Sequence, residues 1–330
     1  MKISRRRLLA GFSCGVLTSQ LPSLSLAESE DGMFDLVAGP SRQRLYLPDA
    51  PSSDLWTYNG SAPGPEIRVK KGGRVQVRFT NKLEEPTSVH WHGIRIDNSM
   101  DGVSGLTQKP VEPGDSFLYD FVTPDAGTFW YHSHNRSWEQ VAKGLYGPLI
   151  VEELTPPDVD HDLIVLIDDW RMTEAGTLAD GFENMHDQAH QGRLGNYARA
   201  LVEPSTPVRR GDRVRLRLIN VATDRIFPIE IEGVDGKIVA NDGMPLVSPQ
   251  ELSSLILAPA QRADIIADIT SPDQIAFMFP TQDGPYLLGE IPVEDANTER
   301  QPSEISALLP NEVTQPDLDN AVSLTLTMEG

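Results

Sequence analysis

The sequence predicts an all-β protein made of two tandem β-sandwich domains. Its 330 residues include 26 glycines and 26 prolines and no long amphipathic helical run, a composition typical of short strands joined by turns. Residues 75–80 and 117–121 alternate apolar and polar side chains, as half-buried strands do. A turn-and-strand pattern also occurs twice in the chain, which indicates that one sandwich plan has been used twice.

The repeat divides the chain into domains. Residues 69–81 and 208–220 share the pattern V-x-x-G-x-R-V-x-[VL]-R-[FL]-x-N. We therefore predict a first domain over 33–155 and a second domain over 160–292. The composition of Thr155–Asp158, with two prolines, is that of a linker between them.

The residues after the second domain are predicted to lead away from it. Residues 293–319 are acidic and Pro-rich, which indicates an extended linker. Ala321–Met328 then alternates as a strand does. A strand without a partner exposes a row of unpaired backbone groups. We therefore expect residues 320–330 to be the first strand of a third domain, and the chain to be a fragment.

The N-terminus has the features of an export signal. Ser4–Leu9 reads SRRRLL, which resembles a twin-arginine motif, and Ser25–Ala27 suits a small-residue cleavage site. We interpret residues 1–27 as a twin-arginine signal and expect a periplasmic or secreted protein; a Sec signal is the alternative. The apolar stretch is too short and too interrupted for a membrane anchor. The only cysteine, Cys14, would leave with this segment, so the mature chain has no disulfide and no thiolate ligand.

The charge excludes two classes of partner. The formal net charge is −20 and the isoelectric point is about 4.7. Nucleic acid and anionic membrane surfaces would both be repelled by such a chain. The oligomeric state is not indicated by any feature of the sequence.

Two histidine pairs predict a metal site. Four of the seven histidines lie in the motifs His90-Trp91-His92 and His132-Ser133-His134. Residues i and i+2 of a strand share one face, so each pair can direct two imidazoles the same way. Two such strands side by side would present four imidazoles, a ligand set suited to copper or zinc. Trp91 and Trp130 could line this site, and core packing is the default assignment for both.

These motifs belong to a longer resemblance. HWHG, a DG-containing loop, PGDSFLYDFVTPDAGTFWYHSH and GLYGPLIVEE together resemble the first cupredoxin domain of the multicopper oxidases over residues 55–153. The resemblance implies two Greek-key cupredoxin sandwiches. The repeat puts Ile229 and Ile231 at the positions of His90 and His92, and it puts His132 near Met278 and His134 near Pro280, so the second copy keeps the scaffold without the histidine ligands. The second domain thus resembles the copper-free middle domain of three-domain members.

The resemblance also implies residue roles. In the family, a trinuclear copper cluster lies between the first and third domains. By motif position His90 would bind the type 2 copper, His92 and His132 one type 3 copper, and His134 the other. Asp101 matches an acid beside the type 2 copper that would orient a ligand or water and relay protons catalytically. A surface Asp-Gly turn is the alternative for Asp101.

A laccase-like oxidoreductase follows from these roles. It would couple the one-electron oxidation of a small-molecule or metal-ion reductant to the four-electron reduction of O2 to water. The remaining cluster ligands, and the type 1 copper site with its cysteine, belong to the third domain of the family. We therefore expect this chain alone to be inactive. Phenols, Cu(I) and other metal ions all remain open as the reductant.

Two other functional classes are compatible with the sequence. One is a non-catalytic periplasmic scaffold related to the cell-division members of the family, against which the retention of all four histidines argues. The other is a structural zinc or copper module without redox chemistry.

The histidines outside the motifs are predicted to have no metal role. His186 and His190 are spaced i, i+4, but the polar residues around them indicate an exposed loop. His161 is flanked by acids and is expected to be solvated. Glu230 and Glu232 are placed on the outer face of a strand.

Overall fold

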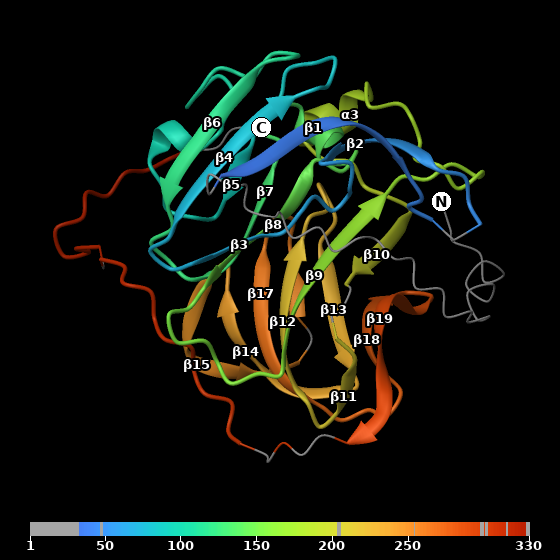
Figure 1. Cartoon of the computed structure of the whole chain (residues 1–330), viewed down its shortest axis with the longest axis vertical. Helices are drawn as coiled ribbons and strands as arrows, with labels where there is room; N and C mark the ends of the chain where they lie inside the picture. The colour runs from blue at the N-terminus through green and yellow to red at the C-terminus, as the bar shows by residue number, and fades with distance from the viewer. Residues whose placement is uncertain are drawn as a thin grey trace.

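A computed structural model describes residues 33–46, 49–202, 206–253, 255–297, 300, 303–314 and 316–327. It forms two β-sandwiches, one above the other in Figure 1, joined by the linker that ends near residue 160. The signal proposed for residues 1–27, with Cys14, lies outside the described residues.

The first sandwich consists of two four-stranded sheets. Their strand orders are β2-β1-β4-β6 and β3-β8-β7-β5. The strands are β1 Phe34–Gln43, β2 Ser53–Tyr58, β3 Ile67–Lys70, β4 Arg74–Asn81, β5 His90–His92, β6 Ser116–Val122, β7 Gly127–His132 and β8 Tyr146–Glu152. Two short helical turns follow β5 and β7: η2 Asn98–Met100 and α2 Ser137–Gln140.

The second sandwich has larger sheets. Their strand orders are β10-β9-β12-β17-β14-β15 and β11-β19-β18-β13-β16. The strands are β9 His161–Trp170, β10 Tyr197–Leu201, β11 Val208–Arg210, β12 Arg213–Asn220, β13 Phe227–Glu232, β14 Val234–Asn241, β15 Met244–Glu251, β16 Leu255–Leu257, β17 Arg262–Ile269, β18 Gln274–Thr281 and β19 Gly284–Asn297. The helix α3, Met185–His190, lies between β9 and β10.

The duplication predicted from the sequence is confirmed strand by strand. The order β2-β1-β4-β6 recurs as β10-β9-β12-β17, and β3-β8-β7-β5 recurs as β11-β19-β18-β13. Phe79 pairs with Phe117 across β4 and β6, and the repeat-equivalent Leu218 pairs with Ala263 across β12 and β17. The hairpin β14–β15 and the strand β16 are additions to the second copy. Both domains are thus all-β sandwiches of one topology.

The alternation of β4 places one face of the strand in a core. Val75, Val77 and Phe79 are fully buried, whereas Arg74 and Arg78 are exposed on the other face. The equivalent strand β12 is buried on both faces. Its second face lies against the first domain, which is why β12 carries arginines with buried ion-pair partners there.

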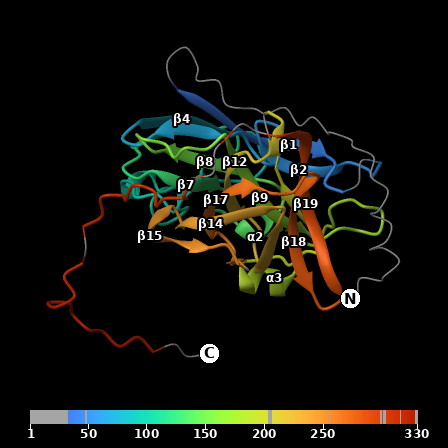
Figure 2. The same ribbon diagram turned by 90° about the horizontal axis from the view of Figure 1, so that it is seen from below.

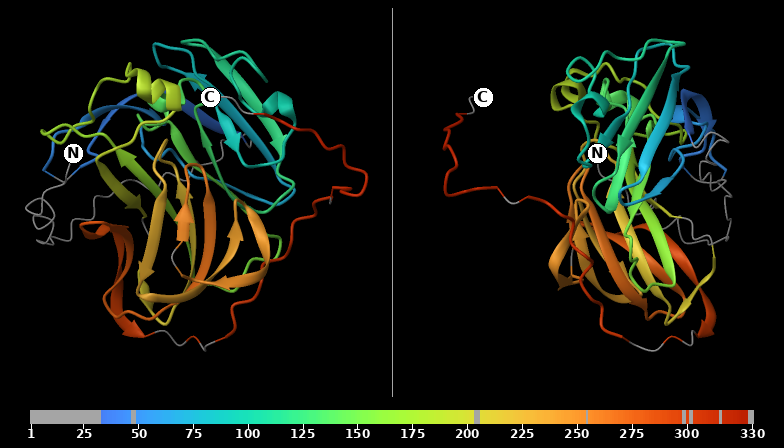
Figure 3. Two further views of the ribbon diagram at one scale, coloured as in Figure 1. Left: turned by 180° about the vertical axis from the view of Figure 1, so that it is seen from behind. Right: turned by 60° about the vertical axis from the view of Figure 1, so that its left-hand side comes forward.

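A buried ionic network joins the domains along β12. Arg215 donates to both carboxylate oxygens of Glu153, at 2.8 and 2.9 Å, and to Asp264 at 2.6 Å. Arg217 pairs with Asp162 at 2.6 Å. Because buried charges need partners, this network specifies one relative placement of the two domains. The stacked arrangement is visible from two directions in Figure 3.

The second domain ends later than predicted. The strand β19 continues to Asn297, past the expected boundary at 292, because it pairs with both β18 and β11.

Part of the predicted linker packs on the second domain. Ile305 and Leu308 pack on Val239, Ala240 and Ile266, and the course of this red segment beside the second domain is visible in Figure 2. We call residues 303–312 the strap.

The strand predicted for Ala321–Met328 is not observed in its described part. Residues 321–327 have no strand conformation and are exposed. A strand requires a hydrogen-bonding neighbour, and none of the described strands pairs with these residues. Among the described residues, no helix has the length and apolar character needed to span a bilayer.

Candidate metal centre

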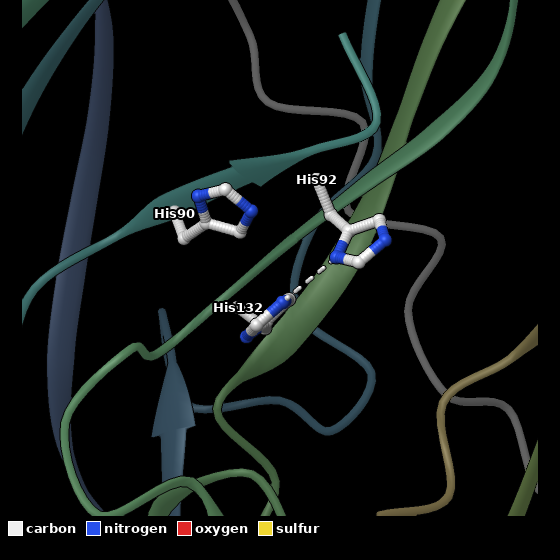
Figure 4. Close-up of side chains that lie close together, drawn as sticks. All are labelled: His90, His92 and His132. Atoms are coloured by element: carbon white, nitrogen blue, oxygen red, sulfur yellow. Dashed lines mark hydrogen bonds between the residues drawn. The ribbon is translucent and has the colours of Figure 1, made fainter. Parts of the chain in front are cut away.

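The two histidine motifs meet on neighbouring strands. Strand β5 is the edge of its sheet and pairs antiparallel with β7, so that His90 lies opposite His132 and His92 opposite Trp130. Residues directly opposite each other share a face of the sheet. This register, together with the i, i+2 spacing, brings the imidazoles predicted from the sequence to one place (Figure 4).

The distances define a compact cluster. One ring nitrogen from each of His90, His92 and His132 lies within 4.8 Å of the others. His132 Nε2 is 3.4 Å from His92 Nδ1, the contact drawn in Figure 4. The ring centroid of His134 is 5.2 Å from that of His90 and 6.2 Å from that of His132. The structure therefore gathers three of the four predicted ligands tightly and places the fourth beside them.

Main-chain oxygens orient two of these rings. His90 Nδ1 donates to the Asp101 carbonyl at 2.7 Å, and His132 Nδ1 donates to the Ser133 carbonyl at 2.8 Å. A ring that donates through Nδ1 presents the lone pair of Nε2. The Asp101 carboxylate is also close, with Oδ1 3.4 Å from His90 Nδ1. Asp101 thus lies where the sequence predicted it, next to His90.

A glycine makes the contact between Asp101 and His90 possible. Gly102 has φ of +77°, and a Cβ there would lie 1.7 Å from the Val89 carbonyl oxygen. No side chain fits at that distance. The turn before it is fixed by Asp97, which accepts from Ser99 N at 2.9 Å and begins η2.

Burial keeps the clustered imidazoles neutral. Desolvation lowers the pKa of His90 and lowers that of His132 well below its usual value. For His92, burial first and then the charge of Arg262 lower the pKa to about 3. Neutral imidazole is the form that binds a metal.

The site fits a copper or zinc ion. A metal–imidazole bond is about 2.0 Å long, so one ion can contact both His92 Nδ1 and His132 Nε2 across their 3.4 Å separation. The donors are nitrogens only, a set typical of copper and zinc rather than of calcium or magnesium.

The two tryptophans of this region have different surroundings. Trp91 is fully buried in the core of the first sandwich, as predicted. Trp130 instead stacks on His132, with ring centroids 4.2 Å apart and planes at 31°. The default assignment of Trp130 to core packing was therefore incomplete, because the register of β5 and β7 puts its ring on the face that carries the histidines.

Arg262 from the second domain borders the site and was not found from the sequence. Its side chain is almost completely buried, and it donates to the Thr128 carbonyl on β7 at 3.2 Å and to Asp242 at 3.1 Å. A Cβ on Gly93 would lie 2.2 Å from its Nη2. The glycine of the HWHG motif therefore leaves room for this arginine. No local pattern around Arg262 signals the contact, which depends on domain packing.

The equivalent position in the second domain has no histidine. Ile229 and Ile231 lie on β13, and Met278 lies on the neighbouring strand β18. Ile229 is part of the second core. The ligand positions of the first copy are used for packing in the second.

Two interpretations of other histidines were wrong. His161 is not solvated, because its Nε2 lies 3.0 Å from Asp212 Oδ2 and its side chain is largely buried. His186 and His190 are not in a loop, because Asn184 caps a short helix there and Asp187 anchors it in ion pairs. Glu230 and Glu232 are on the exposed face of β13, as predicted.

The fold and the histidine cluster define a cupredoxin-type metalloprotein, and comparisons identify its family. Two protein-family models, both described as multicopper oxidase, match residues 41–155 and 161–287. The crystal structure of Lac15 from a marine microbial metagenome is 65% identical, with a TM-score of 0.80, over 87% of this chain and 73% of that one. The chain belongs to the multicopper oxidase family.

Curated relatives match over a smaller share of their length. The multicopper oxidase MmcO of Mycobacterium tuberculosis is 33% identical over 69% of this chain and 50% of its own length. Copper resistance protein A of Pseudomonas syringae pv. tomato is 30% identical over 72% of this chain and 46% of its own. The chain thus spans about half the length of these relatives.

Proposed function

We propose that this chain supplies half of a trinuclear copper cluster in an oxidase that couples the one-electron oxidation of a reductant to the reduction of O2 to water. The observation that carries the proposal is the convergence of three imidazoles from β5 and β7. His90 would hold the type 2 copper, His92 and His132 one type 3 copper, and His134 the other. Copper supplies one-electron redox chemistry, which zinc lacks.

The residues of the chain prepare this site. The carbonyls of Asp101 and Ser133 hold His90 and His132 through Nδ1, so that Nε2 would be the atom available to a metal. Trp130 covers one face of His132 and excludes water from it. Arg262 disfavours a proton on His92 through its charge. These contacts orient the rings, exclude water and disfavour protonation, so the imidazole lone pairs stay available to a metal.

Asp101 has a second role in this proposal. Its carboxylate is 3.4 Å from the His90 ring and about a third exposed, so it connects the site with solvent. We propose that it moves protons between water and the reduced oxygen. In the complete oxidase, Asp101→Asn should retain copper yet lower O2 consumption by about 10²-fold and alter its pH profile. An unchanged rate and profile would exclude the relay.

The other half of the cluster is proposed to come from outside these 330 residues. Four imidazoles are too few for three copper ions with three or four ligands each. A type 1 site needs a cysteine thiolate, and the only cysteine is Cys14. The reductant is proposed to be a small molecule or a metal ion.

Export by the twin-arginine route is proposed from the SRRRLL run. Exchange of Arg5→Lys together with Arg6→Lys should leave precursor in the cytoplasm, as cell fractionation would show. Normal export of that variant would exclude this route.

The test of the proposed site is copper binding by the chain itself. With at most two ligands per metal, we expect weak, colourless copper binding and nitrogen hyperfine coupling in the electron paramagnetic resonance spectrum. His90→Gln with His132→Gln should weaken that binding by at least tenfold. The control His161→Gln, whose ring is paired with Asp212, should not. Equal affinity in both variants would contradict the proposal.

A further inference from the structure

The helix α3 carries a second cluster of imidazoles, away from the strands of the main site. His186 and His190 are both exposed, and their ring centroids are 4.3 Å apart with planes at 38°. Residues i and i+4 lie on one face of a helix, one turn apart. A metal bridging such a pair is a recurring use of this spacing.

The helix is held in place although it is short. Asn184 Oδ1 accepts from His186 N at 2.8 Å, which caps the N-terminus. Asp187, between the histidines, is buried and forms two bonds with Arg171 at 2.9 and 3.0 Å. Arg193 lies 3.4 Å from the same carboxylate. The backbone that presents both rings is therefore fixed before any ligand arrives.

These contacts also define the coordination that α3 can offer. Asp187 is engaged by two arginines and points away from solvent, so it is not a ligand. In the described part of the chain, no acid or third histidine joins the pair in a group of metal-ligating size. Two exposed imidazoles leave the remaining coordination positions to water, which makes an exchangeable site rather than a closed structural one.

We propose that His186 and His190 form a surface site for one divalent transition-metal cation. The Irving–Williams order favours Cu²⁺ among the ions that such a nitrogen pair binds. This inference does not rest on the proposed oxidase activity, and it departs from the expectation that the second domain binds no copper. That expectation rested on Ile229 and Ile231 at the ligand positions of the repeat, and the segment of His186 and His190 was interpreted separately as an exposed loop.

The surroundings of α3 connect this site to the first domain. Trp138 on α2 donates through Nε1 to the Phe182 carbonyl, two residues before the capping Asn184, at 3.2 Å. The two helices are neighbours in Figure 2, and α2 begins three residues after His134. A cation on α3 is therefore held on a segment that packs beside the end of the His132–His134 motif.

Calorimetric titration with Cu²⁺ tests the site. The wild-type chain should bind one equivalent more than the double variant His186→Gln, His190→Gln. A matched variant, His190→Gln with Gln188→His, keeps seven histidines but spaces this pair i, i+2, on opposite sides of the helix. It should lose the same equivalent.

Melting temperatures without metal serve as the folding control, and both variants should match the wild type because His186 and His190 are exposed and Gln188 is only half-buried. His190→Gln alone should weaken the α3 site at least tenfold. The proposal is overturned if the wild type and the two double variants bind the same number of equivalents with the same affinities. It is also overturned if the spacing variant keeps the site, since chelation at i, i+4 is then not its basis.

Discussion

His90 is the residue whose surroundings are most closely fitted to metal binding. Its ring donates to a carbonyl rather than to a carboxylate, so the ring is oriented without a counter-charge at its closest contact. The pKa of His90 is lowered by burial although Asp101 opposes that shift. The balance leaves a neutral ring with its lone pair free at neutral pH. The backbone at Asp101–Gly102 is therefore as much a part of the site as the imidazole.

Gly102→Ala tests this dependence on backbone. Gly102 and Gly105 have nearly the same φ, +77° and +80°, but only at Gly102 would a Cβ meet an atom within 4 Å. Gly105→Ala should cost about 1–2 kcal/mol of conformational strain and leave copper affinity unchanged. Gly102→Ala should cost more and weaken copper binding at least tenfold, because Asp101 is pushed from His90. Urea unfolding and copper titration measure both; equal losses in the two variants would contradict the argument.

Asp168→Asn tests a buried acid at the domain boundary. Asp168 accepts from the Tyr146 hydroxyl of the first domain at 2.7 Å, and burial raises the pKa of Asp168 to about 8. Below pH 8 the folded state keeps a proton that the unfolded state has released above pH 4. Stability is therefore lost as pH rises from about 4 to about 8, at up to about 1.4 kcal/mol per pH unit for one proton.

Asn cannot ionise, and the Tyr146 hydroxyl can either donate to it or accept from it. The unfolding free energy of Asp168→Asn minus that of the wild type should therefore increase as pH rises from 5 to 8. Urea midpoints at several pH values measure the difference. Parallel profiles would mean that Asp168 does not hold a proton in the folded protein.

At the scale of residues, the sequence was sufficient to predict site residues where residue type and spacing both point to the same role. His90, His92 and His132 were identifiable because an i, i+2 repeat on a strand fixes a shared face, and Asp101 because it follows a family motif. Arg262 and Asp168 were not identifiable. Their roles arise from contacts between domains, and nothing in their local sequence separates them from surface charges.

At the scale of elements, strand register is what assembles the site. Strand β5 has only three residues, yet its pairing with β7 places His90 opposite His132. In the second copy β13 pairs with β18 one residue out of that register, so that Glu230 lies opposite Met278 and Ile231 opposite Phe277. One topology thus serves as a metal site or as packing, depending on which side chains occupy a few positions.

The strap is a further element with a testable role. The Asn311 side chain accepts from Ala126 N at 3.0 Å and donates to Ala126 O at 2.8 Å, immediately before β7. Asn311→Ala should cost about 1–2 kcal/mol, since both bonds to Ala126 and the longer ones with Lys71 Nζ and the Gly243 carbonyl are lost, and the Ala126 amide is left unpaired. Exchange of the Ala126 amide hydrogen should accelerate. Asn320→Ala, which removes only an exposed contact with Asp317, is the matched control and should leave that exchange rate unchanged.

Strand prediction succeeded where alternation or repetition was present and failed elsewhere. Residues 75–80 and 117–121 lie within β4 and β6. The end of β19 was missed because its last residues pair with β11, which lies about 85 positions earlier in the chain. The helix α3 was missed because its stability comes from the Asn184 cap and from ion pairs of Asp187, which polar composition alone does not distinguish from a loop.

At the scale of the whole molecule, the duplicated sandwiches differ most where they meet. Arg78 on β4 pairs with Asp35 near solvent, whereas its repeat equivalent Arg217 on β12 is buried. An arginine that is buried in an interface needs a partner for its charge, because an unpaired buried guanidinium is very unfavourable. The second domain thereby packs rigidly on β7 and holds Arg262 beside His92.

Glu153→Ala should show how strongly the two domains depend on each other. Glu153 ends the first domain and makes both of its contacts with Arg215, each carboxylate oxygen accepting from one guanidinium nitrogen. Both side chains are more than nine-tenths buried. Removing the carboxylate leaves Arg215 with Asp264 alone and with unpaired donors in a dry interface. The expected loss is about 3–5 kcal/mol of unfolding free energy, measured in urea.

A matched exposed pair separates burial from charge as the cause of that loss. Glu294 lies 3.6 Å from Arg209, and both side chains are about half exposed. Glu294→Ala removes the same chemical group yet should cost under about 1 kcal/mol, because solvent screens the pair. Its loss should also vanish in 1 M salt, whereas the effect of Glu153→Ala should persist there. If Glu153→Ala is as mild as Glu294→Ala, water reaches the interface and the domains move independently. The site then could not rely on Arg262, and copper affinity of the chain should be insensitive to changes in the second domain.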